Sequence, residues 1–161
     1  MDRIKESFRL SYKTNWRLGR LVESCTKDLQ KEISKVNSMI DNYIRNECGT
    51  IEKGRAFTFR YHVTTGSIID MAINGAKDLT IDEWTELTNE EKRAHNNIED
   101  VELKAVSPYV YLDPTTCDEL ANLQYKLRGD NPRVPKKAYI VRIAVYYAYK
   151  KAFPNEFNEM V

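Results

Sequence analysis

Long apolar runs are missing from this sequence of 161 residues. Nowhere do about 18 apolar residues follow one another, the length that a membrane-spanning helix needs. The amino-terminal segment MDRIKESFRL carries charges where a secretory signal peptide has an apolar stretch. We therefore expect neither a membrane span nor a signal peptide, and we expect a cytoplasmic protein.

Cysteine and histidine are scarce as well. The three cysteines, Cys25, Cys48 and Cys117, are odd in number, far apart and without CxxC spacing, so they indicate reduced structural thiols. The two histidines, His62 and His95, have neither a nearby cysteine nor the spacing of metal ligands. No disulfide framework, metal site or cofactor is expected.

Motifs of common enzyme classes are also absent. The sequence has no GxxxxGK[ST], no GxSxG and no HExxH, the signatures of a phosphate-binding loop, a serine nucleophile and a zinc-protease helix. The carboxylates of DEWTELTNEE (82–91) are typical of a solvated helix face rather than of an acid/base pair. We expect that the chain is not an enzyme.

The net charge is only +1, but it is unevenly distributed. Residues 1–47 hold 10 Lys/Arg against 7 Asp/Glu, residues 48–106 hold 7 against 11, and residues 107–161 hold 8 against 6. A polyanion would therefore be met by the two ends, while the acidic middle spaces them or contacts protein. Random scatter of charge is the alternative.

A short pattern occurs three times at intervals of roughly fifty residues. Each copy alternates aromatic or β-branched residues with polar ones, which predicts a short strand, and each closes on Thr or Asn suited to capping a helix. The copies are ESFRLSYKTN (6–15), AFTFRYHVTT (56–65) and SPYVYLDPTT (107–116).

Helical spacing follows each predicted strand. Two stripes after the first strand predict two helices, the second with Ser34 as N-cap and Gly49 as stop. The stripes are Leu18, Leu21, Val22, Cys25 and Leu29, then Ile33, Val36, Ile40 and Ile44. The middle segment predicts a helix over 68–76 and a second one starting at Thr80, with a capping-box spacing to Glu83 and a poor apolar stripe.

After the third strand, Asp113 and Pro114 start a helix whose apolar face holds Leu120, Leu123 and Leu127. Glycine and proline make RGDNPRVP (128–135) a loop. AYIVRIAVYYAYKKAF (138–153) is apolar on nearly every side, which predicts a helix buried by more than one neighbour.

Strand, helix, turn and helix in this order resemble the ribbon-helix-helix (MetJ/Arc-like) DNA-binding family. FRLSYK (8–13) resembles the family's ribbon, ISKVNSMIDNYI (33–44) its second helix, and VYLDPTTCDEL (110–120) its strand, Asp-Pro and helix junction. The resemblance implies a mainly α fold with short strands, in which tandem units pair as a two-stranded antiparallel ribbon over a helical core. The predicted divisions are 1–49, an acidic middle unit or linker at 50–103, and 104–161.

A narrow ribbon fits the major groove of B-DNA, so the resemblance implies a sequence-specific double-stranded DNA-binding protein, a repressor or a plasmid or phage accessory factor. Arg9 is the leading candidate because a guanidinium reaches guanine O6 and N7 together. The expected base-contacting residues are Ser7, Arg9, Ser11, Tyr109, Tyr111 and Arg60. The expected phosphate-contacting residues are Lys13, Ser34, Lys35, Arg133, Lys136 and Lys137, several of them at the start of a predicted second helix.

Alternatives remain at each step. Arg9 could merely solvate an edge strand, and the two tyrosines could pack on protein. The end units could pair within one chain as a pseudo-dimer, or each could pair with its copy in a homodimer. A protein-interaction module, antitoxin-like or inhibitory, that keeps the fold without binding DNA is the alternative function.

Overall fold

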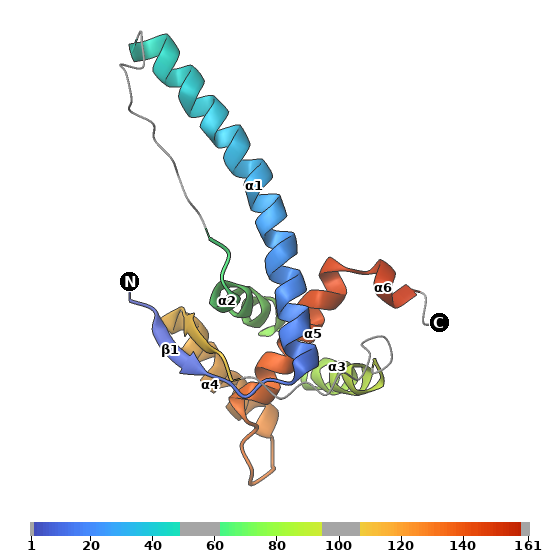
Figure 1. Ribbon diagram of the computed structural model, residues 1–161. Helices are drawn as coiled ribbons and strands as arrows, with labels where there is room; N and C mark the ends of the chain where they lie inside the picture. The colour runs from blue at the N-terminus through green and yellow to red at the C-terminus, as the bar shows by residue number, and fades with distance from the viewer. Residues whose placement is uncertain (1, 49–61, 95–106, 159–161) are drawn as a thin grey trace.

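A computed structural model describes residues 2–48, 62–94 and 107–158 of the chain. They form a mainly helical fold with one small two-stranded antiparallel sheet (Figure 1). In chain order the elements are β1 (Ile4–Ser7), α1 (Tyr12–Cys48), α2 (Thr65–Ala76), α3 (Ile81–Arg93), β2 (Tyr109–Leu112), α4 (Pro114–Arg128), α5 (Lys137–Ala152) and α6 (Asn155–Asn158). The mainly α class with short strands is confirmed.

The first helix is one continuous element of 37 residues. The prediction of two helices separated before Ser34 is wrong. The Ser34 hydroxyl donates to the Gln30 carbonyl at 2.9 Å, so Ser34 lies inside a helix and does not cap one. No proline occurs in α1 and its one glycine, Gly19, is far from Ser34, so nothing in the backbone stops the helix there.

The first strand also ends earlier than predicted. β1 stops at Ser7, and Ser11 caps α1, since its hydroxyl accepts from the Thr14 backbone N–H at 3.3 Å. Phe8 and Leu10 are buried. Tyr12, which lies in the segment 8–13 that resembles a ribbon, is instead the first residue of α1.

The middle helices α2 and α3 start at capping boxes, at Thr64 and at the predicted Thr80. The weak apolar stripe of α3 is completed by polar residues. Glu91 is buried and accepts from Arg17 of α1 at 3.0 Å, with the two side chains only 9% and 4% exposed. A buried charge needs such a partner, so this pair joins α3 to α1.

The carboxy-terminal end follows the prediction closely. The Asp113 carboxylate accepts from the Thr115 N–H at 2.9 Å and caps α4, and Leu120 and Leu123 are buried. Gly129 ends α4 with a φ of +52°, a conformation that residues with a Cβ rarely adopt.

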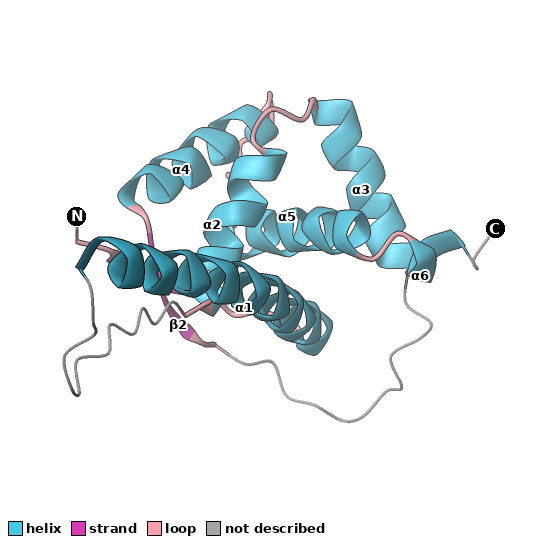
Figure 2. Cartoon of the chain, turned by 90° about the horizontal axis from the view of Figure 1, so that it is seen from above, coloured by secondary structure: helices cyan, strands magenta, loops and turns pink. Residues whose placement is uncertain are grey.

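Helix α5 lies at the centre and contacts α1, α2, α3 and α4, which surround it in Figure 2. It contributes seven buried residues to the core, as its nearly uniform apolar sequence predicts: Ile140, Val141, Ile143, Ala144, Val145, Tyr146 and Tyr149. None of the helices in the described ranges is both long enough and apolar enough to span a membrane.

The two strands pair antiparallel, so segments from the two ends of one chain form the ribbon. Ile4 lies opposite Leu112 and Ser7 lies opposite Tyr109. Helix α2 packs beneath β2 and against α5, and thereby joins the ribbon to the core.

Candidate nucleic-acid interface

The outer face of the ribbon gathers polar and aromatic side chains from both strands. Lys5 lies opposite Tyr111, and Ser7 lies opposite Tyr109, so these four side chains share one face. Tyr109 and Tyr111 are 70% and 54% exposed, whereas the alternate residues of β2 are buried. Two large aromatic side chains are therefore exposed on the same face of the ribbon.

Arg9 lies two residues beyond the end of β1, in alternation with Lys5 and Ser7. Phe8 and Leu10, its neighbours, are buried, and Arg9 itself is exposed. The Lys5 ammonium lies 4.3 Å from the centre of the Tyr109 ring, a cation–π contact that adds positive charge beside the tyrosine. We call Lys5, Ser7, Arg9, Tyr109 and Tyr111 the ribbon face.

Helix α2 holds the ribbon from below. One carboxylate, Asp70, pairs with Arg3 just before β1 and accepts from the Asp113 N–H just after β2, at 3.1 Å in the second case. At Gly66 a Cβ atom would lie 2.2 Å from the Tyr111 carbonyl oxygen, so the α2 backbone touches the β2 backbone directly. Contacts within the chain therefore fix the position of the ribbon on α2.

The amino terminus of α5 lies next to the ribbon. Lys137 pairs with Glu6 of β1 at 2.9 Å. Lys136 is the N-cap, and no side chain among the described residues caps this helix. Uncapped N–H groups and the positive end of the helix dipole suit an anion, and Arg133 and Lys136 are exposed beside them.

The predicted site residues separate into two groups. Ser7, Arg9, Tyr109 and Tyr111 belong to the ribbon face, and Lys137 pairs with Glu6 of β1, whereas Arg133 and Lys136 are exposed residues just before α5. Ser11 instead caps α1, and Lys13 is in the first turn of that helix.

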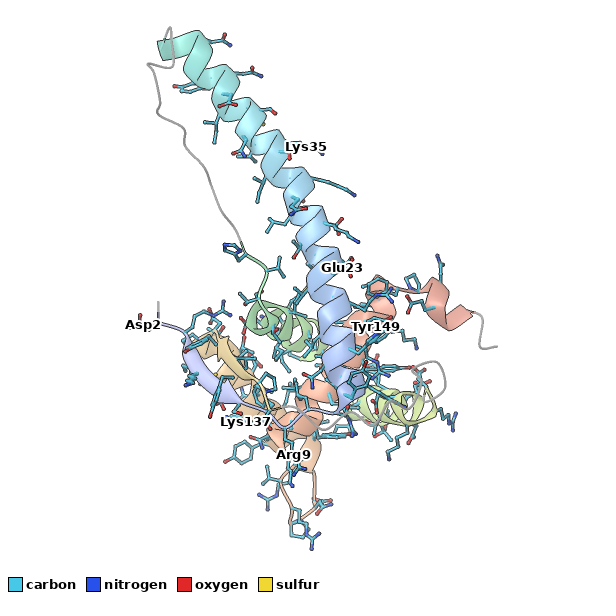
Figure 3. All side chains as sticks on the ribbon, viewed as in Figure 1. Asp2, Arg9, Glu23, Lys35, Lys137 and Tyr149 are labelled. Atoms are coloured by element: carbon cyan, nitrogen blue, oxygen red, sulfur yellow. The ribbon has the colours of Figure 1, made fainter. Side chains whose placement is uncertain are left out.

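Ser34 and Lys35, which were predicted to contact phosphate, do not lie at the start of a helix. No helix begins at Ser34 or Lys35, because both are exposed side chains within α1, and Figure 3 shows Lys35 far from Arg9. Arg60 lies outside the described residues, as does the strand predicted over most of 56–65, while His62 is exposed.

Sequence reasoning missed Lys5 and the α2 residues that hold the ribbon. A signal for Lys5 exists, since Ile4 has the same parity as Phe8 and Leu10, but Glu6 interrupts the apolar alternation. The roles of Asp70 and Gly66 depend on contacts 43 and more residues away along the chain. No local pattern records such contacts.

Asp113 and two cysteines have pKa values that their surroundings shift. Hydrogen bonds from Thr115 lower the pKa of the capping Asp113. Cys25 and Cys117 carry free thiols whose pKa is raised, mainly by burial, so both stay protonated at neutral pH. The Cys48 side chain is not described. Within the described ranges no three His, Cys, Asp or Glu are grouped so as to hold a metal ion.

Comparison with known proteins found no matching family model, no similar curated protein and no similar solved structure. The ribbon-helix-helix resemblance therefore depends on the residue pattern alone, and any function assigned from it is a proposal.

Proposed function

We propose that this chain is a sequence-specific double-stranded DNA-binding protein, a transcriptional repressor or a plasmid or phage accessory factor, and that the ribbon enters the major groove. The observation that carries the proposal is the ribbon face itself. It presents Lys5, Ser7 and two exposed tyrosines on a two-stranded element whose opposite side is buried along β2, with Arg9 exposed just beyond β1.

The chemistry of the ribbon face suits base edges. A two-stranded ribbon fits the width of the major groove, where each base pair shows a distinct pattern of donors and acceptors. Arg9 can donate to guanine O6 and N7 together, which is worth about 1–3 kcal/mol of discrimination. Tyrosine and serine hydroxyls donate to bases or phosphates.

The surroundings suit the phosphate backbone. The α5 amino terminus lies beside β1, where Lys137 pairs with Glu6, and it would position the protein without reading sequence. The exposed Arg133 and Lys136 precede it along the chain. The two strands carry different outward residues, Lys5 and Ser7 against Tyr109 and Tyr111. A pseudo-dimeric ribbon of this kind would read two unlike half-sites.

The first test is a salt series of binding to duplex DNA by fluorescence anisotropy, on random sequence and on a duplex enriched from a random library. We expect log affinity to fall linearly with log salt, because each neutralised phosphate releases counterions. Arg9→Ala should lower affinity for the enriched duplex by about 1–3 kcal/mol and relax its specificity.

Lys35→Ala is the matched control. It removes one exposed cation from α1, far from the ribbon, and should leave binding unchanged (Figure 3). An equal loss of affinity in both variants would show that the ribbon is not the DNA interface. No binding at low salt would refute DNA binding altogether.

A protein-interaction module is the second candidate, favoured by the high exposure of Tyr109 and Tyr111. Tyrosine is enriched at protein interfaces because its ring is apolar and its tip is polar. A complex with protein through these rings should vary little with salt, whereas DNA binding should weaken steeply.

A further inference from the structure

The distal part of α1 stands away from the other described elements (Figure 1). Among the described residues, the core and the partly buried side chains that border it end on α1 at Cys25. Beyond that point α1 continues to Cys48, with Val36 49%, Met39 71% and Tyr43 66% exposed. More than half of the longest helix therefore has no packing partner within the described chain.

Apolar residues on this segment have the spacing of a coiled coil. Starting from Val22, they are separated alternately by four and three residues, and Thr26 is the one polar member. The residues of this stripe, which we call the α1 seam, are Val22, Thr26, Leu29, Ile33, Val36, Ile40 and Tyr43. Three heptads of this kind keep one apolar line on one side of a helix.

The α1 seam borders the globular part of the chain only at its start. Val22, like Leu21 and Cys25, packs on the core. From Leu29 onward no residue of the seam does so among the described residues. A partner lying along the seam from Leu29 to Tyr43 would therefore not displace α2 or α5.

The helix itself needs such a partner. From Leu29 to Cys48 it contains serine and asparagine at several positions, and both have modest helix propensity. Isolated helices shorter than about 12–15 residues are marginal in water, and longer ones depend mostly on an amphipathic face that packs. The apolar seam is the face available for this packing.

We propose that the α1 seam pairs with the same seam of a second copy of this chain, as a parallel two-stranded coiled coil. Ile33 and Ile40 occupy a positions, with Leu29 and Val36 at d positions, and β-branched residues at a favour two parallel strands. In register, each of these residues meets its own copy.

Charge is compatible with self-association. Residues 26–48 contain four Lys/Arg and four Asp/Glu, so two copies do not repel as a whole. Of the residues flanking the seam between Cys25 and Met39, only Glu32 is charged, and in a parallel pair it faces Asn37. An antiparallel pair with full overlap would bring the two Glu32 carboxylates together at its centre, which disfavours that arrangement.

This inference does not depend on DNA binding, and it is tested without DNA. Sedimentation of the full chain over the micromolar range should show a dimer. Ile33→Asp with Ile40→Asp should give a monomer with an unchanged thermal unfolding midpoint of the globular part, because the core ends at Cys25. The matched control is Ser34→Asp with Ser38→Asp, two equal charges off the seam, and it should stay dimeric.

Chain direction has its own test. Val36→Cys should form an interchain disulfide on mild oxidation, because a parallel pair brings the two d positions together, whereas Ser38→Cys on the outer side and the parent protein should not. A monomeric parent protein, or a dimer unaffected by the aspartates, would overturn the proposal. A dimer without the Val36→Cys crosslink would overturn the parallel arrangement.

Discussion

The two ends of the chain start alike and then diverge. Each begins with a four-residue strand, and the strands pair with each other. At the carboxy-terminal end, β2 is followed by α4, a loop and α5, whereas within the described part of residues 1–49 β1 is followed by α1 alone. Only the carboxy-terminal end has the strand-helix-helix order predicted for both.

The difference teaches that an N-cap residue does not by itself divide a helix. Gly129, with a φ of +52°, and the prolines at 132 and 135 stop α4 and delay α5. Around Ser34 there is neither glycine nor proline, so helical hydrogen bonds continue and the serine hydroxyl bonds back to Gln30.

The largest expected loss of stability follows from removing the ion pair that joins α1 to α3. Arg17→Ala leaves Glu91 buried without its closest cation, and removing one partner of a buried pair costs about 3–5 kcal/mol. Arg142, 3.7 Å from the Glu91 carboxylate, should keep the loss near the lower end. Urea unfolding measures it.

Arg20→Ala is the control for that substitution, since Arg20 pairs with Glu156 at the surface of the same helix. The free energy of unfolding of the Arg20→Ala variant should be lower than that of the parent by about 1 kcal/mol or less. Equal losses in the two variants would contradict the assignment of Arg17 and Glu91 as a buried anchor.

The second prediction concerns a substitution that would divide α1 into two helices and so make the amino-terminal end resemble the carboxy-terminal end. Ser34→Pro should break α1 where the sequence suggested a division, at a local cost of about 3 kcal/mol. Far-UV circular dichroism should show lost helix, while the globular part melts as before because α1 contributes to the core only up to Cys25. Ser34→Ala should retain full helicity, and cooperative unfolding of the whole chain by the proline would contradict this picture.

A third prediction concerns the close contact between the α2 backbone and the β2 backbone. Gly66→Ala should destabilise the fold by about 1–3 kcal/mol, because the new methyl group would overlap the Tyr111 carbonyl. Gly75→Ala, in the same helix with open space around it, should instead stabilise by about 0.5–1 kcal/mol. Thermal unfolding distinguishes the two, and the same sign for both would be evidence against direct backbone contact.

The smallest effect is on alkaline stability. Burial, and then the Glu90 carboxylate, raise the pKa of Tyr146 to about 12. An unfolded tyrosine loses its proton near pH 10, so the stabilisation is complete below that pH and is lost as the pH rises towards 12.

Tyr146→Phe should therefore lose less stability than the parent between pH 9 and 11, as measured by urea midpoints at each pH. Tyr149, whose pKa burial also raises, remains in the variant, so part of the alkaline loss should persist. Identical losses in the variant and the parent would argue against this role for Tyr146.

Much of the local structure could be predicted from the sequence. Thr80 with Glu83, and Asp113 with Pro114, are short-range signals whose chemistry is complete within one helical turn, and both start helices as expected. The alternation in β2 placed Tyr109 and Tyr111 outward. β1 was harder, because Glu6 occupies an inward position where its carboxylate pairs with Lys137, a partner 131 residues away.

The sequence by itself determined the mainly α class, the caps at Thr80 and Asp113, the burial of α5 and the exposure of Ser7 and Arg9, because these depend on neighbours within a few residues. Tertiary structure alone decided that the two ends share one ribbon, that Asp70 holds both strands, and that Glu91 is buried with Arg17. The physical reason is that a charge enters a core only where a distant partner compensates its desolvation, and no local spacing encodes that partner.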